Sequence, residues 1–202
     1  MSAQDLCELV QVGEELRNLE YKGPMKWDDE MTKTKITKAA LAMSNIRDGG
    51  WIVIGMKELN NGKYERVGLT KEEADTFNHD HISSHINVYA DPPVQFHVNP
   101  QDCEGKKYVM VKIDEFEKLP VICKKDYRRA ELKQGKIYVR TRRKNENSEV
   151  STPDEMREII NLAVDKNTRA FVARLQKVGV IPIRAVLDAE EEAFRKQLGD
   201  LI

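Results

Sequence analysis

The sequence has 202 residues, of which 33% are charged and 40% hydrophobic, and its formal net charge is −1. This length suits one domain, or one domain with a helical appendage, that buries a real core. Recurring aliphatic runs exclude a disordered chain, and no run approaches the roughly 18 apolar residues that a membrane span needs. The N-terminus carries acidic residues and lacks the basic start and apolar core of a signal peptide.

The three cysteines, Cys7, Cys103 and Cys123, are odd in number and have no close spacing. This pattern predicts neither a disulfide framework nor a zinc ribbon. We therefore expect reduced thiols and a cytoplasmic location.

Hydrophobic periodicity and turn residues predict a mixed α/β order of elements. The expected helices are 3–12, about 32–45, 71–78, 81–89 and 151–164, followed by helical segments at 168–178 and 185–198. The expected strands are 15–22, 51–54, 64–69, 94–98, 107–113 and 135–141, with a short apolar stretch at 120–123. We divide the chain into a domain over 1–164 and a helical extension over 165–202.

The stretch 44–56 joins a segment with helical periodicity to a segment typical of a buried strand. Residues before it have apolar side chains at helical spacing, and the apolar run 51–54 after it is typical of a fully buried strand. Asp48, Gly49 and Gly50 predict the turn between them, and Glu58 follows the strand at a sheet end. Gly50 and Gly55 have P-loop spacing, but a strand lies between them and no Gly-Lys-Ser/Thr follows, which argues against nucleotide hydrolysis.

Three acidic residues form the first candidate site. Glu15 and Glu20 lie close together in the sequence and are followed by Lys22, while Glu58 comes after the central strand. Converging carboxylates repel unless a cation or protons intervene, and oxygen ligands suit magnesium or manganese. In a chain with 34 acidic residues, solvated surface carboxylates are the alternative.

A basic segment over 124–144 is the second candidate site. Ten lysines and arginines against two acidic residues give it a net charge of +8, which leaves −9 for the rest of the chain. Clustered basic residues bind polyanions, and the interleaved Tyr127 and Tyr138 could stack on bases. The alternative is a solvated hairpin that pairs with acids elsewhere. The expected nucleic-acid-binding residues are Lys124, Lys125, Arg128, Arg129, Lys136, Tyr138, Arg140, Arg142, Arg143 and Lys144.

Two further patterns receive other interpretations. His81 and His85 have metal-ligand spacing beside His79, but without a neighbouring cysteine or an HExxH acid they favour surface or helix-cap positions over zinc. In the extension, Phe171 and Leu175 share an apolar face, which indicates packing on the domain or, alternatively, a homodimer surface.

The order of these motifs resembles the Schlafen AlbA-type domain family over about residues 14–162. The matching elements are Glu15 with LRNL and Glu20-Tyr21-Lys22, the helix KITKAALAMSN, the run GGWIVIG, Gly68, Pro92-Pro93, GKIYVR and the turn into a helix near Glu155. The resemblance implies a central mixed sheet flanked by helices that binds nucleic acid.

In Schlafen proteins, similar domains cleave tRNA and rRNA with three acids and a divalent cation, while many bacterial and archaeal members are described only as DNA-binding or regulatory modules. By this resemblance, Glu15 and Glu20 match the two glutamates of the first motif. Glu58 stands where the family usually has Asp, which adds one methylene group but keeps the charge.

Two functions of different classes follow. As a binding module for DNA or RNA, the protein needs no cofactor and grips phosphates with the basic hairpin. As a nuclease, Glu15, Glu20 and Glu58 would hold magnesium or manganese while Lys22 stabilises developing charge. A regulator or assembly protein that acts through its C-terminal helices is the third alternative.

Overall fold

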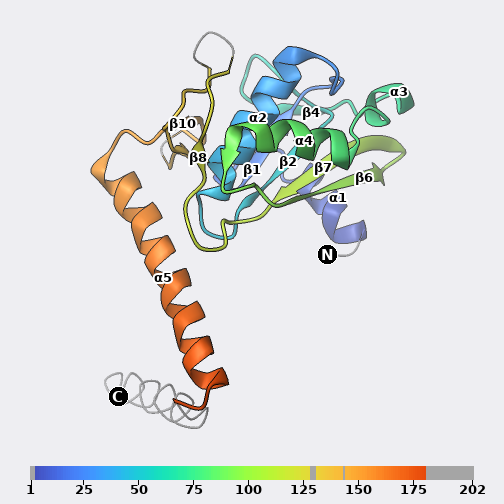
Figure 1. Ribbon diagram of the computed structural model, residues 1–202. Coiled ribbons are helices and arrows are strands. Elements are labelled where there is room, and N and C mark those ends of the chain that lie inside the picture. Colours follow the sequence, from blue (N-terminus) through green and yellow to red (C-terminus); the bar gives the residue numbers. More distant parts are fainter. Residues whose placement is uncertain (1–2, 128–130, 143, 181–202) are drawn as a thin grey trace, which may run out of the picture. The chain divides into compact units, whose positions relative to one another are not determined.

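The computed structural model of the chain describes residues 3–127, 131–142 and 144–180. The chain contains both helices and strands (Figure 1), which confirms the predicted mixed α/β class. The chain divides into two compact units, residues 1–162 and 163–202, and each is described by itself. None of the helices in the described part is long and apolar enough to cross a membrane.

The first unit is built on a four-stranded mixed sheet. Its strands stand in the order β1 (Leu19–Lys22), β2 (Gly50–Ile54), β7 (Lys106–Ile113) and β6 (Phe96–Cys103). β1 and β2 are parallel, whereas β7 pairs antiparallel with both β2 and β6. The apolar run of β2 therefore lies between two partner strands, as the sequence predicts.

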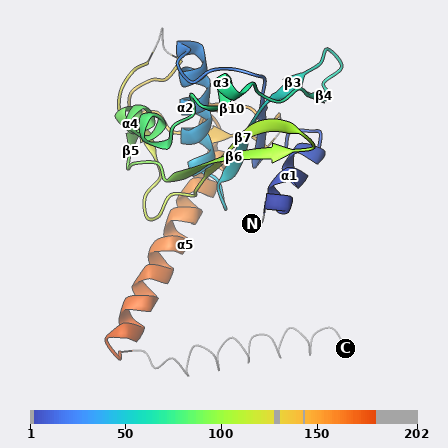
Figure 2. The same cartoon turned by 90° about the vertical axis from the view of Figure 1, so that its right-hand side faces the viewer.

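Helices cover both faces of this sheet, and Figure 2 shows α1 and α2 on opposite sides of it. α1 (Ala3–Gln11) packs Leu6 and Val10 against the face that carries Val53. α2 (Glu30–Ser44) contacts β2 and β7. Because side chains alternate along a strand, the fully buried Ile52 faces the α2 side.

Paired strands and further helices surround the sheet. β3 (Met56–Glu58) pairs with β4 (Tyr64–Arg66), β5 (Ala90–Asp91) with β8 (Ile122–Cys123), and β9 (Tyr138–Arg140) with β10 (Asn147–Glu149). The remaining helices are α3 (Lys71–Ala74), α4 (His79–Tyr89) and α5 (Pro153–Lys177).

Several predicted boundaries are wrong. The strands predicted over 15–22, 64–69 and 135–141 are shorter in the structure, where they are β1, β4 and β9. The helix predicted over 71–78 ends at Ala74. The strand predicted over 94–98 continues through Pro100 to Cys103, because β6 is an edge strand, where a proline costs no ladder hydrogen bond. α5 runs without a break through Asp165, since no glycine or proline lies there to end it. The segment predicted over 185–198 lies outside the described residues.

Asn45 joins the end of α2 to distant parts of the chain. Its amide is buried and its Nδ2 lies 2.9 Å from the carbonyl oxygens of both Val121 and Tyr138 and 3.1 Å from that of Leu41. Its Oδ1 accepts from the Val121 N–H at 2.8 Å. One buried side chain thus satisfies backbone groups on three segments.

The turn before β2 is as tight as the sequence predicts. Asp48 and Gly49 both adopt φ of 64°. A Cβ atom on Gly49 would lie 2.1 Å from the carbonyl oxygen of Ile113. Glycine is therefore required for both its backbone angle and its lack of a side chain.

The prediction of three reduced thiols is wrong. Cys7 on α1 and Cys103 at the end of β6 form a disulfide, although 96 positions separate them in the sequence. Only the buried Cys123 is a free thiol. Sequence spacing could not reveal the pair, because the antiparallel partner β7 brings the end of β6 to α1 in space.

Replacing Asn45 by alanine should lower the free energy of unfolding by about 2–4 kcal/mol, because several buried backbone groups lose their only side-chain partner. Urea unfolding measures this loss. Asn60→Ala is the control, since Asn60 is exposed and should change stability by less than about 0.5 kcal/mol. Equal effects of the two changes would contradict the role of Asn45.

Reduction of the disulfide should lower the free energy of unfolding by about 2–4 kcal/mol, because the long cross-linked loop restricts the unfolded chain. Urea unfolding with and without dithiothreitol measures the loss. A Cys7→Ser, Cys103→Ser double variant should show the same loss and no response to dithiothreitol. Three titratable thiols in unreduced, unfolded protein would show that the bond does not form.

Candidate functional site

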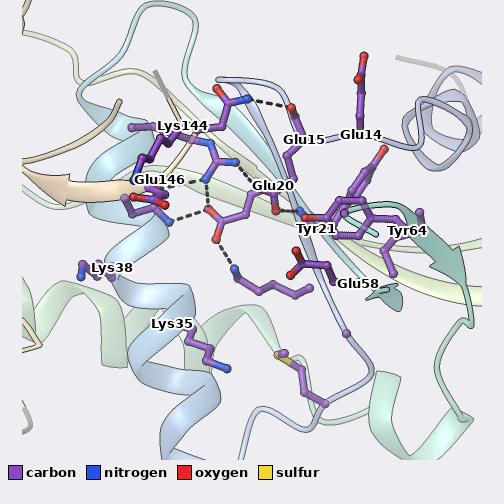
Figure 3. Close-up of a pocket in the computed structure, with 18 of the residues that line it drawn as sticks. Glu14, Glu15, Glu20, Tyr21, Lys35, Lys38, Glu58, Tyr64, Lys144 and Glu146 are labelled. Carbon is purple, nitrogen blue, oxygen red and sulfur yellow. Dashed lines mark hydrogen bonds and ion pairs between the residues drawn. The ribbon is translucent and has the colours of Figure 1, made fainter. Parts of the chain in front are cut away.

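A groove of about 1340 Å³ lies between β1, α2, the β3–β4 hairpin and the β9–β10 hairpin (Figure 3). Its charged lining consists of Glu14, Glu15, Glu20, Lys22, Lys35, Lys38, Glu58, Glu131, Arg140, Lys144 and Glu146. The fold therefore brings all three predicted carboxylates and Lys22 to one groove. Tyr21, Tyr64 and several methionines supply its aromatic and apolar lining.

Arg140 occupies the floor of the groove as a buried cation. Its side chain is only 1% exposed and bridges two carboxylates, with Nη2 2.7 Å from Glu15 Oε2 and Nη1 2.8 Å from Glu20 Oε2. Its Nε also donates to the Leu16 carbonyl oxygen at 3.2 Å, and Nη2 to that of Leu19 at 3.3 Å. A buried guanidinium is stable only with such a full set of acceptors.

The other oxygens of these two carboxylates also have donors. Glu15 Oε1 accepts from the Tyr21 N–H at 2.9 Å. Glu20 Oε1 is paired with the Lys22 ammonium group, and its Oε2 accepts from Asn147 Nδ2 at 2.7 Å. Glu20 is 3% exposed, so this carboxylate has little contact with solvent.

The carboxylate oxygens of Glu15 and Glu20 are not arranged to bind a divalent cation. A metal site requires carboxylate oxygens directed at one point, whereas Glu15 and Glu20 direct theirs at Arg140, Lys22 and backbone or amide N–H groups. Within the described residues, no group of three or more His, Cys, Asp or Glu side chains is arranged to hold a metal ion. We therefore derive no chemical step through a metal.

Three lysines line the groove without ion pairs. Lys35 and Lys38 lie one turn apart on α2, and Lys144 lies in the turn between β9 and β10. None of them forms an ion pair with a residue of the described chain, and Lys38 lies over the Tyr138 ring with its Nζ 5.8 Å from the centroid. Figure 3 shows Lys35 and Lys38 on α2, away from Glu58.

Most other residues of the predicted basic hairpin form ion pairs or lie outside the described residues. Lys133 and Lys136 pair with Glu149, at 2.6 and 3.6 Å, and Arg142 pairs with Glu158 at 3.2 Å. Lys124 and Lys125 are exposed, and neither forms an ion pair with a described residue. Arg128, Arg129 and Arg143 lie outside the described residues.

The two tyrosines expected to stack on bases form hydrogen bonds within the protein. Tyr138 is 1% exposed, its hydroxyl oxygen accepts from the Lys133 N–H at 2.9 Å, and burial raises its pKa to about 12. Tyr127 is half-buried and donates to Glu30 Oε2 at 2.9 Å. The Tyr138 ring is thus part of the core, where a base cannot reach it.

Glu158 is a second carboxylate that two arginines share. Arg17 forms two bonds to it, at 2.6 and 2.9 Å, and Arg142 pairs with it from the end of β9. Burial alone would raise the pKa of Glu158, but the hydrogen bonds from Arg17 and Arg142 outweigh it and leave this pKa below its ordinary value. Arg17 also donates to the Arg140 carbonyl oxygen at 3.1 Å, which ties it to the floor of the groove.

The histidines lie apart from the groove. His79 begins α4 and packs on Phe96, with ring centroids 5.0 Å apart, and His81 is exposed. His85 packs edge-on against Trp27 at 5.6 Å. Burial, followed by the charge of Lys33, lowers the pKa of His85.

Lys35, Lys38 and Tyr64 line the groove but are not among the site residues predicted from the sequence. Lys35 and Lys38 are spaced i, i+3 in a helix with an apolar opposite face, a pattern that predicts both on one exposed side. The local sequence around Tyr64 predicts only a strand. Its position at the groove depends on the β3–β4 pairing.

Replacing Arg140 by methionine should lower the free energy of unfolding by about 3–5 kcal/mol, because Glu20 would remain buried without a compensating charge. Urea unfolding is the measurement. Arg142→Met is the matched control on the same strand end. Its side chain is 72% exposed, so the loss should be less than about 1 kcal/mol. If both variants lost the same stability, the ion pairs of Arg140 with Glu15 and Glu20 would not stabilise the fold more than a surface ion pair does.

Comparisons with known proteins assign the family. Two solved structures are similar: the DIP2311 protein from Corynebacterium diphtheriae (TM-score 0.49, 12% identity, 77% of this chain covered) and the N-terminal domain of a RecG-related protein from Nitrosomonas europaea (TM-score 0.39, 20% identity, 57% covered). The chain spans 28% of the first protein and 74% of the second domain. A search of curated proteins found no match. The family described as "Schlafen, AlbA_2" matches residues 15–149, which include β1 and both groove hairpins, and the chain therefore belongs to this family.

Proposed function

We propose that the protein binds nucleic acid, DNA or RNA, in the groove between α2 and the two hairpins. The observation that carries this proposal is the row of lysines, Lys35, Lys38 and Lys144, that line one groove without ion pairs in the described chain. Ammonium groups that lack protein partners can neutralise backbone phosphates and release counterions. Membership of the Schlafen, AlbA_2 family supports the same assignment.

The pairing of Arg140 makes an anion-binding groove compatible with its many acids. Two of the six glutamates, Glu15 and Glu20, are neutralised by Arg140, and Glu20 also by Lys22. The repulsion that these carboxylates would exert on a phosphate is therefore reduced at the floor. The lysines on α2 then present positive charge to a phosphate backbone.

Two exposed lysines of the predicted basic hairpin lie outside the groove lining. Lys124 and Lys125 have no ion pair among the described residues, so they are additional candidates to contact phosphates. Lys136, Arg142 and the buried Arg140 have acidic partners, so binding through them would cost an existing ion pair. The proposed contact surface is thus narrower than the charge count of the sequence indicates.

A metal-dependent nuclease receives less support from the site. Glu15, Glu20 and Glu58 line the same groove, but the first two use their oxygens within the protein. Labelled tRNA and single-stranded DNA incubated with manganese or with a chelator test this alternative. Cleavage that requires manganese and disappears in Glu20→Gln would show that the protein is a nuclease and not only a binding module.

A role for the C-terminal residues stays a prediction. α5 carries the exposed Phe171, which fits the predicted homodimer surface or the regulatory alternative, but residues 181–202 lie outside the described chain. The cytoplasmic location likewise stays a prediction.

Replacing Lys35 and Lys38 together by alanine should weaken binding to single-stranded nucleic acid and reduce the slope of log K against log salt by about 1.4, which corresponds to two phosphate contacts. Fluorescence anisotropy over a series of salt concentrations measures both quantities. The weakening should be nearly the same for all sequences, because phosphates carry no sequence information.

Lys63→Ala with Lys71→Ala is the matched control. Both residues are exposed, lie outside the groove lining and form no ion pair in the described chain. The control removes the same total charge and should leave the slope unchanged. If both double variants weakened binding equally, only net charge would matter and the groove would not be the binding site.

A further inference from the structure

Tyr64 and Glu58 line the groove together from the β3–β4 hairpin. In the antiparallel β3–β4 hairpin the two residues are direct partners, so their side chains project from the same face. Both line the groove, and Figure 3 shows them side by side. An aromatic ring and a carboxylate are thus presented together at one point.

The Tyr64 ring is held in a fixed orientation. It packs on Tyr21, with ring centroids 4.8 Å apart and an interplanar angle of 60°, and burial, followed by the nearby Glu15 and Glu58 carboxylates, raises the pKa of its hydroxyl. Tyr21 is itself anchored, since its hydroxyl donates to the Leu9 carbonyl oxygen at 2.6 Å. The half-buried Tyr64 therefore offers a pre-organised surface that loses little rotational freedom on binding.

Glu58 differs from the other two predicted carboxylates. It is exposed and forms no hydrogen bond or ion pair with a described residue, whereas every oxygen of Glu15 and Glu20 has a donor. An ionised carboxylate only accepts hydrogen bonds. It would therefore bind a group that presents N–H donors, and it would repel a phosphate.

We propose that Glu58 and Tyr64 form a base-binding subsite that takes an unstacked guanine from a single strand. This inference rests on the proposed function and deepens it. Among the common bases, guanine places two neighbouring N–H donors, N1–H and N2–H, on its Watson–Crick edge, which matches the two oxygens of one carboxylate. Adenine and cytosine have an acceptor beside their amino group, and uracil and thymine have carbonyls on both sides of their N–H.

The charge distribution of the groove suits such a ligand. Lys35 and Lys38 line the groove from α2, and Glu58 lines it from the β3–β4 hairpin, so a ligand that contacts both must present anionic phosphates and N–H donors together. An unpaired nucleotide has both, with a π face that can stack on Tyr64. In a duplex the Watson–Crick edge is already used, which favours unpaired strands.

The test uses the full chain and fluorescein-labelled octamers of rU and of dT, each also prepared with one central guanine, adenine or cytosine. We expect the octamer with a central guanine to bind about fivefold or more tightly than its parent in at least one of the two backgrounds. A factor of about five is the lower end of the discrimination that a bidentate contact to a base provides, as suits an open groove. Glu58→Gln should abolish this preference, because the glutamine amide N–H group opposes the guanine donors. The affinity for the parent octamer should not fall, because the change removes a carboxylate that repels phosphate. Tyr64→Leu should weaken binding of all octamers.

Glu65→Gln is the matched control. Glu65 lies on the same hairpin, points to the opposite face and does not line the groove. This variant should keep the full guanine preference. Loss of the preference in Glu65→Gln would show an effect of hairpin charge, which overturns the assignment to Glu58.

The outcomes separate the two proposals. Salt-dependent binding without base preference, a preference for adenine or cytosine, or a guanine preference that survives Glu58→Gln overturns the subsite and leaves the groove as a binding site. Absence of binding to every octamer at low salt overturns the proposed function and the subsite with it.

Discussion

The buried guanidinium of Arg140 is the interaction on which the groove depends. It joins β9 to the N-terminal segment and β1, 120 to 125 positions away in sequence, through two carboxylates and two backbone carbonyls. Removing a guanidinium from water costs several kcal/mol, which is recovered only when its donors are satisfied together. The arrangement is therefore cooperative: Glu15, Glu20, the Leu16 and Leu19 carbonyls and Arg140 are stable as a set.

This network also decides which charges remain for a ligand. A count of lysines and arginines treats Arg140 and Lys144 alike, yet the first is buried between carboxylates and the second is exposed. Arg140 and Lys22 neutralise the two innermost glutamates. The lining charges without an ion pair among the described residues are Lys35, Lys38 and Lys144 and the carboxylates of Glu14, Glu58, Glu131 and Glu146, so the groove carries both signs of charge and is not simply basic.

The features that could be predicted from the sequence are those set by neighbouring residues. The apolar run of β2 and the Asp48–Gly49 turn follow from side-chain burial and backbone angles within a few positions. The disulfide and the pairing of Arg140 depend on segments brought together by the sheet, which local patterns do not encode. The end of β6 was not predictable for a related reason. A proline removes a hydrogen bond between strands only where its N–H position faces a partner strand, so its effect depends on whether the strand lies at an edge of the sheet.

The burial of β9 shows the same limit at one strand. Alternation predicts Ile137 and Val139 inward, but Tyr138, Val139 and Arg140 are all buried, because α2 contacts this strand and the N-terminal segment supplies the acceptors for Arg140. A strand covered on both sides shows no alternation. Its polar side chains must then find partners in the protein, which is why the hydroxyl of Tyr138 meets the Lys133 N–H and Arg140 meets two glutamates.

The stretch from β2 to β3 explains why three carboxylates in one groove have different roles. Gly55, with φ of 115°, separates β2 from β3, so Glu58 projects from a hairpin and not from the central sheet. Glu20 lies in β1 and is 3% exposed, so its oxygens must find donors inside the protein. Glu58 lies where solvent can satisfy it, so it needs no partner in the protein and stays available to a ligand. The position of each carboxylate in the fold, and not its residue type, therefore determines whether it supports the structure or can recognise a base.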